Sequence, residues 1–263
     1  MGIADHPHIH GDTHCDTNGH LIYKVTVAYD GTAFCGWQVQ PRQRTVQGVL
    51  QKCLSEMAER PIIIHGSGRT DSGVHGIGQV FHFSGPFPIP VDRLVKACNT
   101  QLPFDVALQY AEEAPLDFHA RYSVIAKTYR YRICTAPDRD PLRANQVWFT
   151  GRDLNLDAMI EAGEFLKGTH DFASFAASGS PRDSTVRTIQ SITMERYGDE
   201  IHMEFTADGF LYHMVRNLAG TLADVGRMRS HPEAVSKILE AKNRSKAGKT
   251  APACGLYLLH VQY

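Results

Sequence analysis

The sequence predicts an α+β protein made of two related units that share one order of helices and strands. Short stretches with strand-like alternation are separated by stretches with helical spacing, and their order occurs twice between residues 21 and 263. The composition, 43% apolar and 21% charged, is that of an ordinary globular protein. No run of about eighteen apolar residues occurs, so no membrane partner is expected.

The first unit, residues 21–115, has the order β-α-β-β-α-β. In its opening strand, Val25, Val27 and Tyr29 share one face. Thr45 is a plausible N-cap for the helix that follows. A glycine-rich loop separates the second strand from the third. We expect strands at residues 23–30, 61–65, 79–83 and 106–110, and helices at residues 46–57 and 91–102.

The second unit, residues 116–263, repeats this order. A hairpin is expected to turn at Gly198, and a capping box from Ser230 to Glu233 marks the start of a helix. Two such split β-α-β units, ferredoxin-like or RRM-like, imply two mainly antiparallel sheets backed by helices. We expect strands at residues 127–135, 189–197, 200–207 and 256–263, and helices at residues 155–166, with Ile160 facing inward, and after Glu233.

Residues 1–20 stand apart, because five histidines and Cys15 lie in a polar stretch without apolar periodicity. Their residue types suit zinc, which makes a metal site one interpretation. The spacing matches no standard zinc finger, so we expect a disordered tail. The six cysteines include no C-x-x-C pair, which favours reduced, mostly buried thiols in a cytosolic protein.

The net charge argues mildly against a nucleic-acid partner. The chain has 27 basic and 28 acidic residues, for a net charge of -1, whereas nucleic-acid-binding domains tend to be basic. A phosphate-binding surface would therefore have to be a local cluster of cations.

The most informative stretch is residues 66–83, in which five glycines surround Arg69 and Asp71. Glycine lets a backbone approach a ligand closely, and an aspartate near an arginine keeps its charge, as a nucleophilic carboxylate must. The residue types alone favour a simpler alternative, a turn with a local hydrogen bond at Asp71. A dinucleotide site is excluded, because Asp71 stands where the last glycine of that fingerprint belongs.

The motif GRTDSGVH, residues 68–75, closely resembles the catalytic motif of the tRNA pseudouridine synthase A family. Five further segments resemble family motifs in the same order. Ser72 and Gly76 stand where many relatives have alanine. The further segments are YDGTAFCGWQ (29–38), DFHARYS with KTYRYRI (117–123 and 127–133), FLYHMVRN (210–217) and GLYL (255–258).

The resemblance implies a role for each of four residues. Asp71 would be the catalytic nucleophile, which either attacks the ribose C1′ or takes a proton from C2′. Tyr129 would lie against the flipped uracil and assist proton removal at C5. Arg69 would help extrude the base, since unstacking costs a few kcal/mol. Arg216 would pair with Asp71 and stabilise its charge.

RNA contacts require cations near these motifs. Arg121, Lys127 and Arg130, together with His75, are the expected substrate-binding residues beside Tyr129 and Arg69. On the strand 127–135 the cations and tyrosines alternate, so they face opposite sides. The loop 178–187 is polar and long enough to fold over an RNA stem. Further candidate cations are Arg42, Arg44, Arg132, Lys242, Arg244, Lys246 and Lys249, and His75, His82, His119 and His213 are expected to be structural or phosphate-facing.

By resemblance, the substrate is the anticodon stem-loop of tRNA, at uridine positions 38, 39 and 40. The resemblance also implies a cytoplasmic homodimer without cofactor or metal, and an active cleft between the two domains with Asp71 at its floor. Two alternatives are a non-catalytic RNA-binding module on the same fold and a metal-binding protein that uses residues 1–20. Neither needs a carboxylate at position 71.

Overall fold

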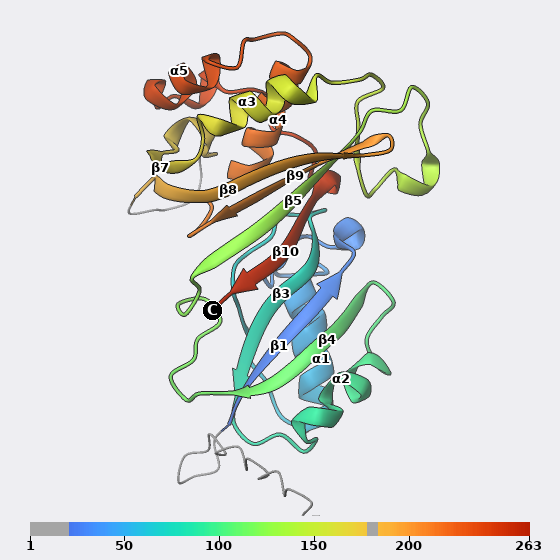
Figure 1. Ribbon diagram of the computed structural model, residues 1–263. Helices are drawn as coiled ribbons and strands as arrows, with labels where there is room; N and C mark the ends of the chain where they lie inside the picture. Colours follow the sequence, from blue (N-terminus) through green and yellow to red (C-terminus); the bar gives the residue numbers. More distant parts are fainter. Residues whose placement is uncertain (1–20, 178–183) are drawn as a thin grey trace, which may run out of the picture.

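The computed structural model describes residues 21–177 and 184–263, and residues 1–20, the expected tail, lie outside this range. Its strands form a single sheet with the order β4-β1-β3-β10-β5-β9-β8-β7 (Figure 1). Two short strands lie off this path, β2 beside β3 and β6 beside β5. The strands are β1 Ile22–Tyr29, β2 His65–Gly66, β3 His75–Ser84, β4 Val106–Ala114, β5 Ala126–Cys134, β6 Trp148–Phe149, β7 Gly168–Asp171, β8 Val186–Tyr197, β9 Glu200–Ala207 and β10 Leu256–Gln262.

The α+β class and the mainly antiparallel pairing are confirmed, but the expectation of two separate sheets is wrong. Strand β10 lies between the two halves, parallel to β3 at Tyr257 and Leu258 and antiparallel to β5. The strand that ends the second unit therefore joins the sheet of the first. The domain boundary near residue 115 stays a prediction.

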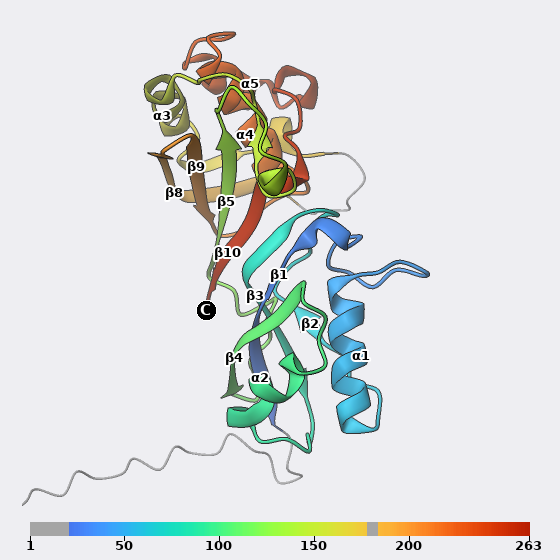
Figure 2. The ribbon, with the colours of Figure 1, turned by 90° about the vertical axis from the view of Figure 1, so that its right-hand side faces the viewer.

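Helices flank both halves of this sheet (Figure 2). The helices α1 and α2 accompany β1, β3 and β4, whereas α3, α4 and α5 accompany β8 and β9. The helices are α1 Val46–Ala58, α2 Val91–Asn99, α3 Leu156–Glu164, α4 Met214–Gly226 and α5 Ala234–Ala241, and 3₁₀ turns occur at Gly31–Ala33, Pro141–Arg143, Ala173–Phe175, Arg244–Lys246 and Ala253–Gly255. No helix within these described ranges has the length and apolar character needed to cross a bilayer.

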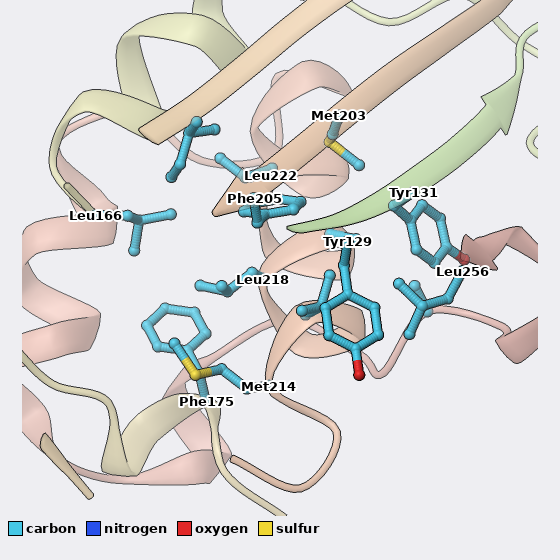
Figure 3. Close-up of a cluster of buried hydrophobic side chains, with 14 of the residues drawn as sticks. Tyr129, Tyr131, Leu166, Phe175, Met203, Phe205, Met214, Leu218, Leu222 and Leu256 are labelled. Carbon is cyan, nitrogen blue, oxygen red and sulfur yellow. The ribbon is translucent and has the colours of Figure 1, made fainter. Parts of the chain in front are cut away.

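Two clusters of buried side chains form the core. The first lies in the N-terminal half and contains Trp37 and Phe81. The second lies in the C-terminal half and contains Phe205 and Leu218 (Figure 3). Val80 belongs to the second cluster although β3 belongs to the first half, so the two cores meet at the β3–β10 junction.

Several expected elements are confirmed. Val25, Val27 and Tyr29 are buried on β1, and Gly48 N–H donates to Thr45 Oγ1 at 3.2 Å, as a capped helix start requires. The β8–β9 hairpin turns at Gly198, whose φ of 60° suits a glycine. The five described cysteines are free thiols.

The expected strand over residues 61–65 is wrong, since only His65 and Gly66 pair with β3. Side chains of α1 instead bind the backbone of the segment that follows the helix, just before β2. Ile62 N–H donates to Ser55 Oγ at 2.8 Å, and Gln47 Nε2 donates to Ile64 O at 3.0 Å. Because these side chains satisfy the backbone groups, the segment needs no neighbouring strand.

The sequence does not predict helix α4, and two predictions, for the start of α5 and for Ile160 of α3, are wrong. All residues of α4 except Arg216 and Asp224 are buried, so the helix lacks the polar face that makes a helical period visible. The expected capping box fails, because the residue that caps α5 is Glu233 and it makes no side-chain cap hydrogen bond. Ile160 is 40% exposed instead of inward-facing.

Candidate active site

The loop of residues 67–74, between β2 and β3, is hydrogen-bonded to the end of β1 and to the segment that follows it. Trp37 N–H donates to Thr70 O at 3.1 Å, and the Tyr29 hydroxyl lies 2.8 Å from Thr70 Oγ1. Gly36 has a φ of 80°, and a Cβ there would lie 2.7 Å from Thr70 O. The segment of residues 29–38 therefore supports the loop that carries Asp71.

Asp71 pairs with Arg216, as expected from the resemblance. Arg216 Nη1 donates to Asp71 Oδ2 at 3.1 Å, and Arg216 Nε donates to Ala251 O at 2.8 Å. Their side chains are 23% and 15% exposed, so the pair is largely shielded from water. Among residues 21–177 and 184–263, none forms a hydrogen bond or ion pair with Asp71 Oδ1.

His213 also contacts Asp71, which the sequence reading missed. Its Nε2 lies 3.3 Å from Asp71 Oδ2, the oxygen that Arg216 holds. Burial lowers the pKa of His213, the nearby Asp71 charge opposes that shift, and Arg216 and Arg244 reinforce it. The motif FLYHMVRN contained both residues, but their common partner lies 145 residues from Arg216 in the chain.

Tyr129 stands on β5, opposite Leu258 of β10 and Phe205 of β9. Its ring packs edge-on against Phe210, with centroids 5.1 Å apart, at the margin of the second cluster (Figure 3). Burial, with smaller effects from Tyr29 and Asp71, raises the pKa of the Tyr129 phenol, which is neutral at pH 7.

The Tyr129 hydroxyl has no hydrogen-bond partner among the described residues, and no fully buried side-chain oxygen or nitrogen of theirs lacks one. It therefore reaches an accessible surface while its ring is buried.

Arg69 belongs to this loop, and Lys127 contacts the loop from β5. The Arg69 side chain is exposed, and its Nε donates to Gln38 Oε1 at 3.1 Å. Lys127 Nζ donates to Ser67 O at 2.6 Å. Burial, reinforced by Arg121, lowers the pKa of Lys127 to about 8. Lys127 thus binds the loop backbone directly.

Several expected RNA contacts already have partners in the protein. Arg130 donates to Glu204 at 2.6 and 2.8 Å, from the face of β5 opposite Tyr129. His75 is buried, accepts from Gly31 N–H at 3.1 Å and stacks on Tyr257. The other paired cations are Arg44 with Asp105, Arg132 with Glu200 and Lys242 with Asp171, while Arg244 binds backbone carbonyls of Ala247 and Gly248.

Other cations lie exposed without a carboxylate partner within the described ranges. Arg42 and Arg121 are two of them. Lys246 and Lys249, on the segment that precedes Ala251, are two more.

The glycines around Asp71 mainly admit neighbouring parts of the protein. A Cβ at Gly66 would meet the Trp37 ring at 2.6 Å, and one at Gly78 would meet Leu259 O at 2.4 Å. Gly78 lies within β3, so the expected loop is shorter than residues 66–78. Close packing against the protein therefore explains these glycines, and ligand contact is not needed for them.

The cleft, the mobile loop and the metal alternative stay predictions. Two surface hollows, one near His75 and one between α4 and α5, do not include Asp71. Of the loop 178–187, residues 178–183 lie outside the described range, and Val186 and Arg187 belong to β8. The described part of the chain contains no cluster of three or more metal-ligating side chains, and residues 1–20 lie outside it.

Comparison with known proteins assigns this arrangement to the pseudouridine synthases. The profile of the tRNA pseudouridine synthase family matches residues 25–123 and 162–263. A protein of Limosilactobacillus reuteri called tRNA pseudouridine synthase A is 45% identical over 246 residues, which cover 92% of this chain and 96% of that protein.

Two further relatives carry the same name. The protein of Anoxybacillus flavithermus is 46% identical over 241 residues, covering 91% of this chain and 98% of its own. The protein of Halalkalibacterium halodurans is 46% identical over 233 residues, covering 88% and 89%. The chain belongs to the tRNA pseudouridine synthase family. It is thus an isomerase that converts uridine to pseudouridine in tRNA.

Proposed function

We propose that this isomerase acts on uridines 38, 39 and 40 in the anticodon stem-loop of tRNA, with Asp71 as its reacting carboxylate. The pair of Asp71 with Arg216 carries the proposal. One carboxylate oxygen is held by a cation, and the other has no hydrogen-bond partner among the described residues, as suits a nucleophile or a proton acceptor. The relatives' name, tRNA pseudouridine synthase A, supports tRNA as the substrate, and the motif resemblance supports the anticodon stem-loop.

The reaction breaks the C1′–N1 glycosidic bond and makes a C1′–C5 bond in its place. Asp71 Oδ1 either attacks C1′ or takes the proton from C2′, and both routes need one unoccupied oxygen. The freed uracil turns over, C5 bonds to C1′, the hydrogen on C5 leaves as a proton, and N1 takes one up. No atom is gained or lost in the balance between substrate and product.

The ring of Tyr129 would form the floor for the uracil, and its hydroxyl would assist proton removal from C5. Two observations support this role: the ring is buried, and the hydroxyl has no partner among the described residues. Because burial keeps the phenol neutral, its hydroxyl would assist by hydrogen bonding while the proton from C5 passes on to solvent.

Arg69 would enter the stack in place of the extruded base. Its side chain is exposed and has a single hydrogen bond, to Gln38, which a bound RNA can replace at small cost. The loop 67–74 would lie at the floor of a cleft between the two halves.

The unpaired cations Arg42, Arg121, Lys246 and Lys249 are better candidates for phosphate contacts than Arg130. The Arg130 charge is balanced by Glu204, whereas an unpaired cation can bind a phosphate and release its counterion. A tRNA substrate, which the relatives' name also gives, supports a cytoplasmic enzyme. We further propose a homodimer in which one tRNA contacts both subunits.

The test is release of tritium from tRNA that carries 5-tritiated uridine. We expect the protein to release tritium and Asp71→Asn to release none. Anticodon stem-loops with uridine at only one of positions 38, 39 and 40 report which positions react. Binding of tRNA without release would instead favour a non-catalytic RNA-binding module, and release by Asp71→Asn would exclude Asp71 as the reacting group.

A further inference from the structure

We propose that His213 is a positioning residue, which holds Asp71 Oδ2 together with Arg216 so that Oδ1 points toward the substrate. This inference rests on the proposed role of Asp71. It adds to the site a residue that the motif comparison left without a function.

The contact is the first argument. His213 Nε2 lies 3.3 Å from Asp71 Oδ2, and Arg216 Nη1 lies 3.1 Å from the same oxygen. His213 immediately precedes α4 and Arg216 is in its first turn, so residues three apart project from one side of the helix start. Two groups on Oδ2 restrain the carboxylate plane more than one, because rotation about the Cβ–Cγ bond moves Oδ2 away from both.

The backbone is the second argument. His213 has a φ of 59° and a ψ of 6°, the left-handed region in which a residue with a side chain is strained. Its side chain makes no capping hydrogen bond to α4, although serine, threonine, aspartate or asparagine there would stabilise the helix start. Neither the local conformation nor helix capping favours a histidine at this position. The contact with Asp71 accounts for it.

The surroundings fix the charge of the imidazole. Asp71 faces it from the loop 67–74, Arg216 from α4 and Arg244 from the segment after α5, while the Tyr212 ring packs on it with centroids 3.9 Å apart. Burial and the two arginines lower the pKa of His213 against the effect of Asp71, so the ring is neutral at pH 7. A neutral ring keeps its polar Nε2 3.3 Å from Oδ2 without adding a second positive charge beside the nucleophile.

The test separates this contact from the backbone conformation. His213→Gly removes the imidazole and relieves the left-handed strain, so we expect thermal stability to rise while kcat for tritium release falls about tenfold or more and KM for tRNA changes less than twofold. His213→Gln keeps the strain and an N–H of similar reach, and we expect it to retain kcat within about threefold.

Glu59→Gly is the matched control. Glu59 ends α1 with a φ of 51°, so glycine relieves the same strain far from Asp71. We expect it to raise thermal stability and to leave kcat unchanged.

Each outcome has a definite meaning. If Asp71→Asn is inactive but His213→Gly keeps the wild-type kcat, the role of His213 is overturned and the proposed function stands. If His213→Gln is as slow as His213→Gly, positioning by a polar side chain in contact with Oδ2 is refuted. If Asp71→Asn is active, the proposed function itself fails.

Discussion

Replacing Arg216 by lysine tests whether the shape of the guanidinium matters as well as its charge. Arg216 makes two hydrogen bonds in different directions, through Nη1 to Asp71 and through Nε to Ala251 O. A lysine ammonium is a point charge on a flexible chain and cannot reproduce this fork. The variant Arg216→Lys therefore keeps the charge beside Asp71 but loses one of the two bonds.

The expected cost follows from that loss. A hydrogen bond from a charged group contributes about 1.5–3 kcal/mol, which corresponds to a roughly 10- to 150-fold lower kcat/KM. Arg216→Met removes the charge as well and leaves Asp71 without its cation. Breaking a shielded ion pair costs about 3–5 kcal/mol, so we expect a roughly 150- to 5000-fold loss.

Tritium release under single-turnover conditions measures this effect apart from product release, and tRNA binding is measured in parallel. Arg227→Lys is the control on the same helix, because Arg227 is 14% exposed and pairs with Asp224 at 3.4 Å, away from the loop 67–74. A rate for Arg216→Lys within threefold of the unaltered protein would refute the argument from the two-bond geometry.

Three further predictions concern the frame of the site. Gly36→Ala should lower the free energy of unfolding by about 1–3 kcal/mol and slow the reaction, because its Cβ would press on Thr70 O. The control Gly198→Ala, with positive φ but open space, should lower it by only about 1 kcal/mol and leave the rate unchanged. Chemical denaturation and tritium release measure the two effects. Burial lowers the pKa of His82 to about 4, so below pH 6.5 the unfolded chain binds more protons than the native one, and stability falls by about 1.4 kcal/mol per pH unit down to pH 4. His82→Gln should flatten the dependence of unfolding free energy on pH between pH 4 and 6.5, and between pH 7 and 8 it should have the same slope as the unaltered protein. Equal slopes of the two proteins at acid pH would contradict the assignment. Tyr129→Phe should keep its melting temperature and tRNA binding but lose about tenfold or more in kcat, and an unchanged kcat would exclude a role for the hydroxyl.

The sequence predicts a helix or strand well where one face of that element is buried and the other faces solvent. Val25, Val27 and Tyr29 alternate on a strand with one buried face, and Thr45 satisfies backbone donors three residues away. Helix α4 is not predicted in this way, because it is buried on almost every side. Arg216 is one of only two residues of α4 that are not buried.

The site itself follows from the sequence only through the resemblance. Asp71 and Arg216 are 145 residues apart, and no local period brings them together. The contact of His213 with Asp71 was not predicted for the same reason, since the two residues come together only after the sheet joins the two halves. Arg130 is a different case: its place near a motif predicts an RNA contact, and the structure pairs it with Glu204 on the neighbouring strand, so that its role stays a prediction.

The position of β10 in the sheet has a consequence for biosynthesis. Residues 256–262 connect β3, made early, to β5, made midway, so the ribosome must deliver almost the whole chain before the two halves can join. Pairing between such distant segments is slow compared with helix or hairpin formation. A nascent chain stalled before Leu256 would hold Asp71 and Arg216 on halves not yet fastened together, and it would be translated from tRNAs that it cannot yet modify.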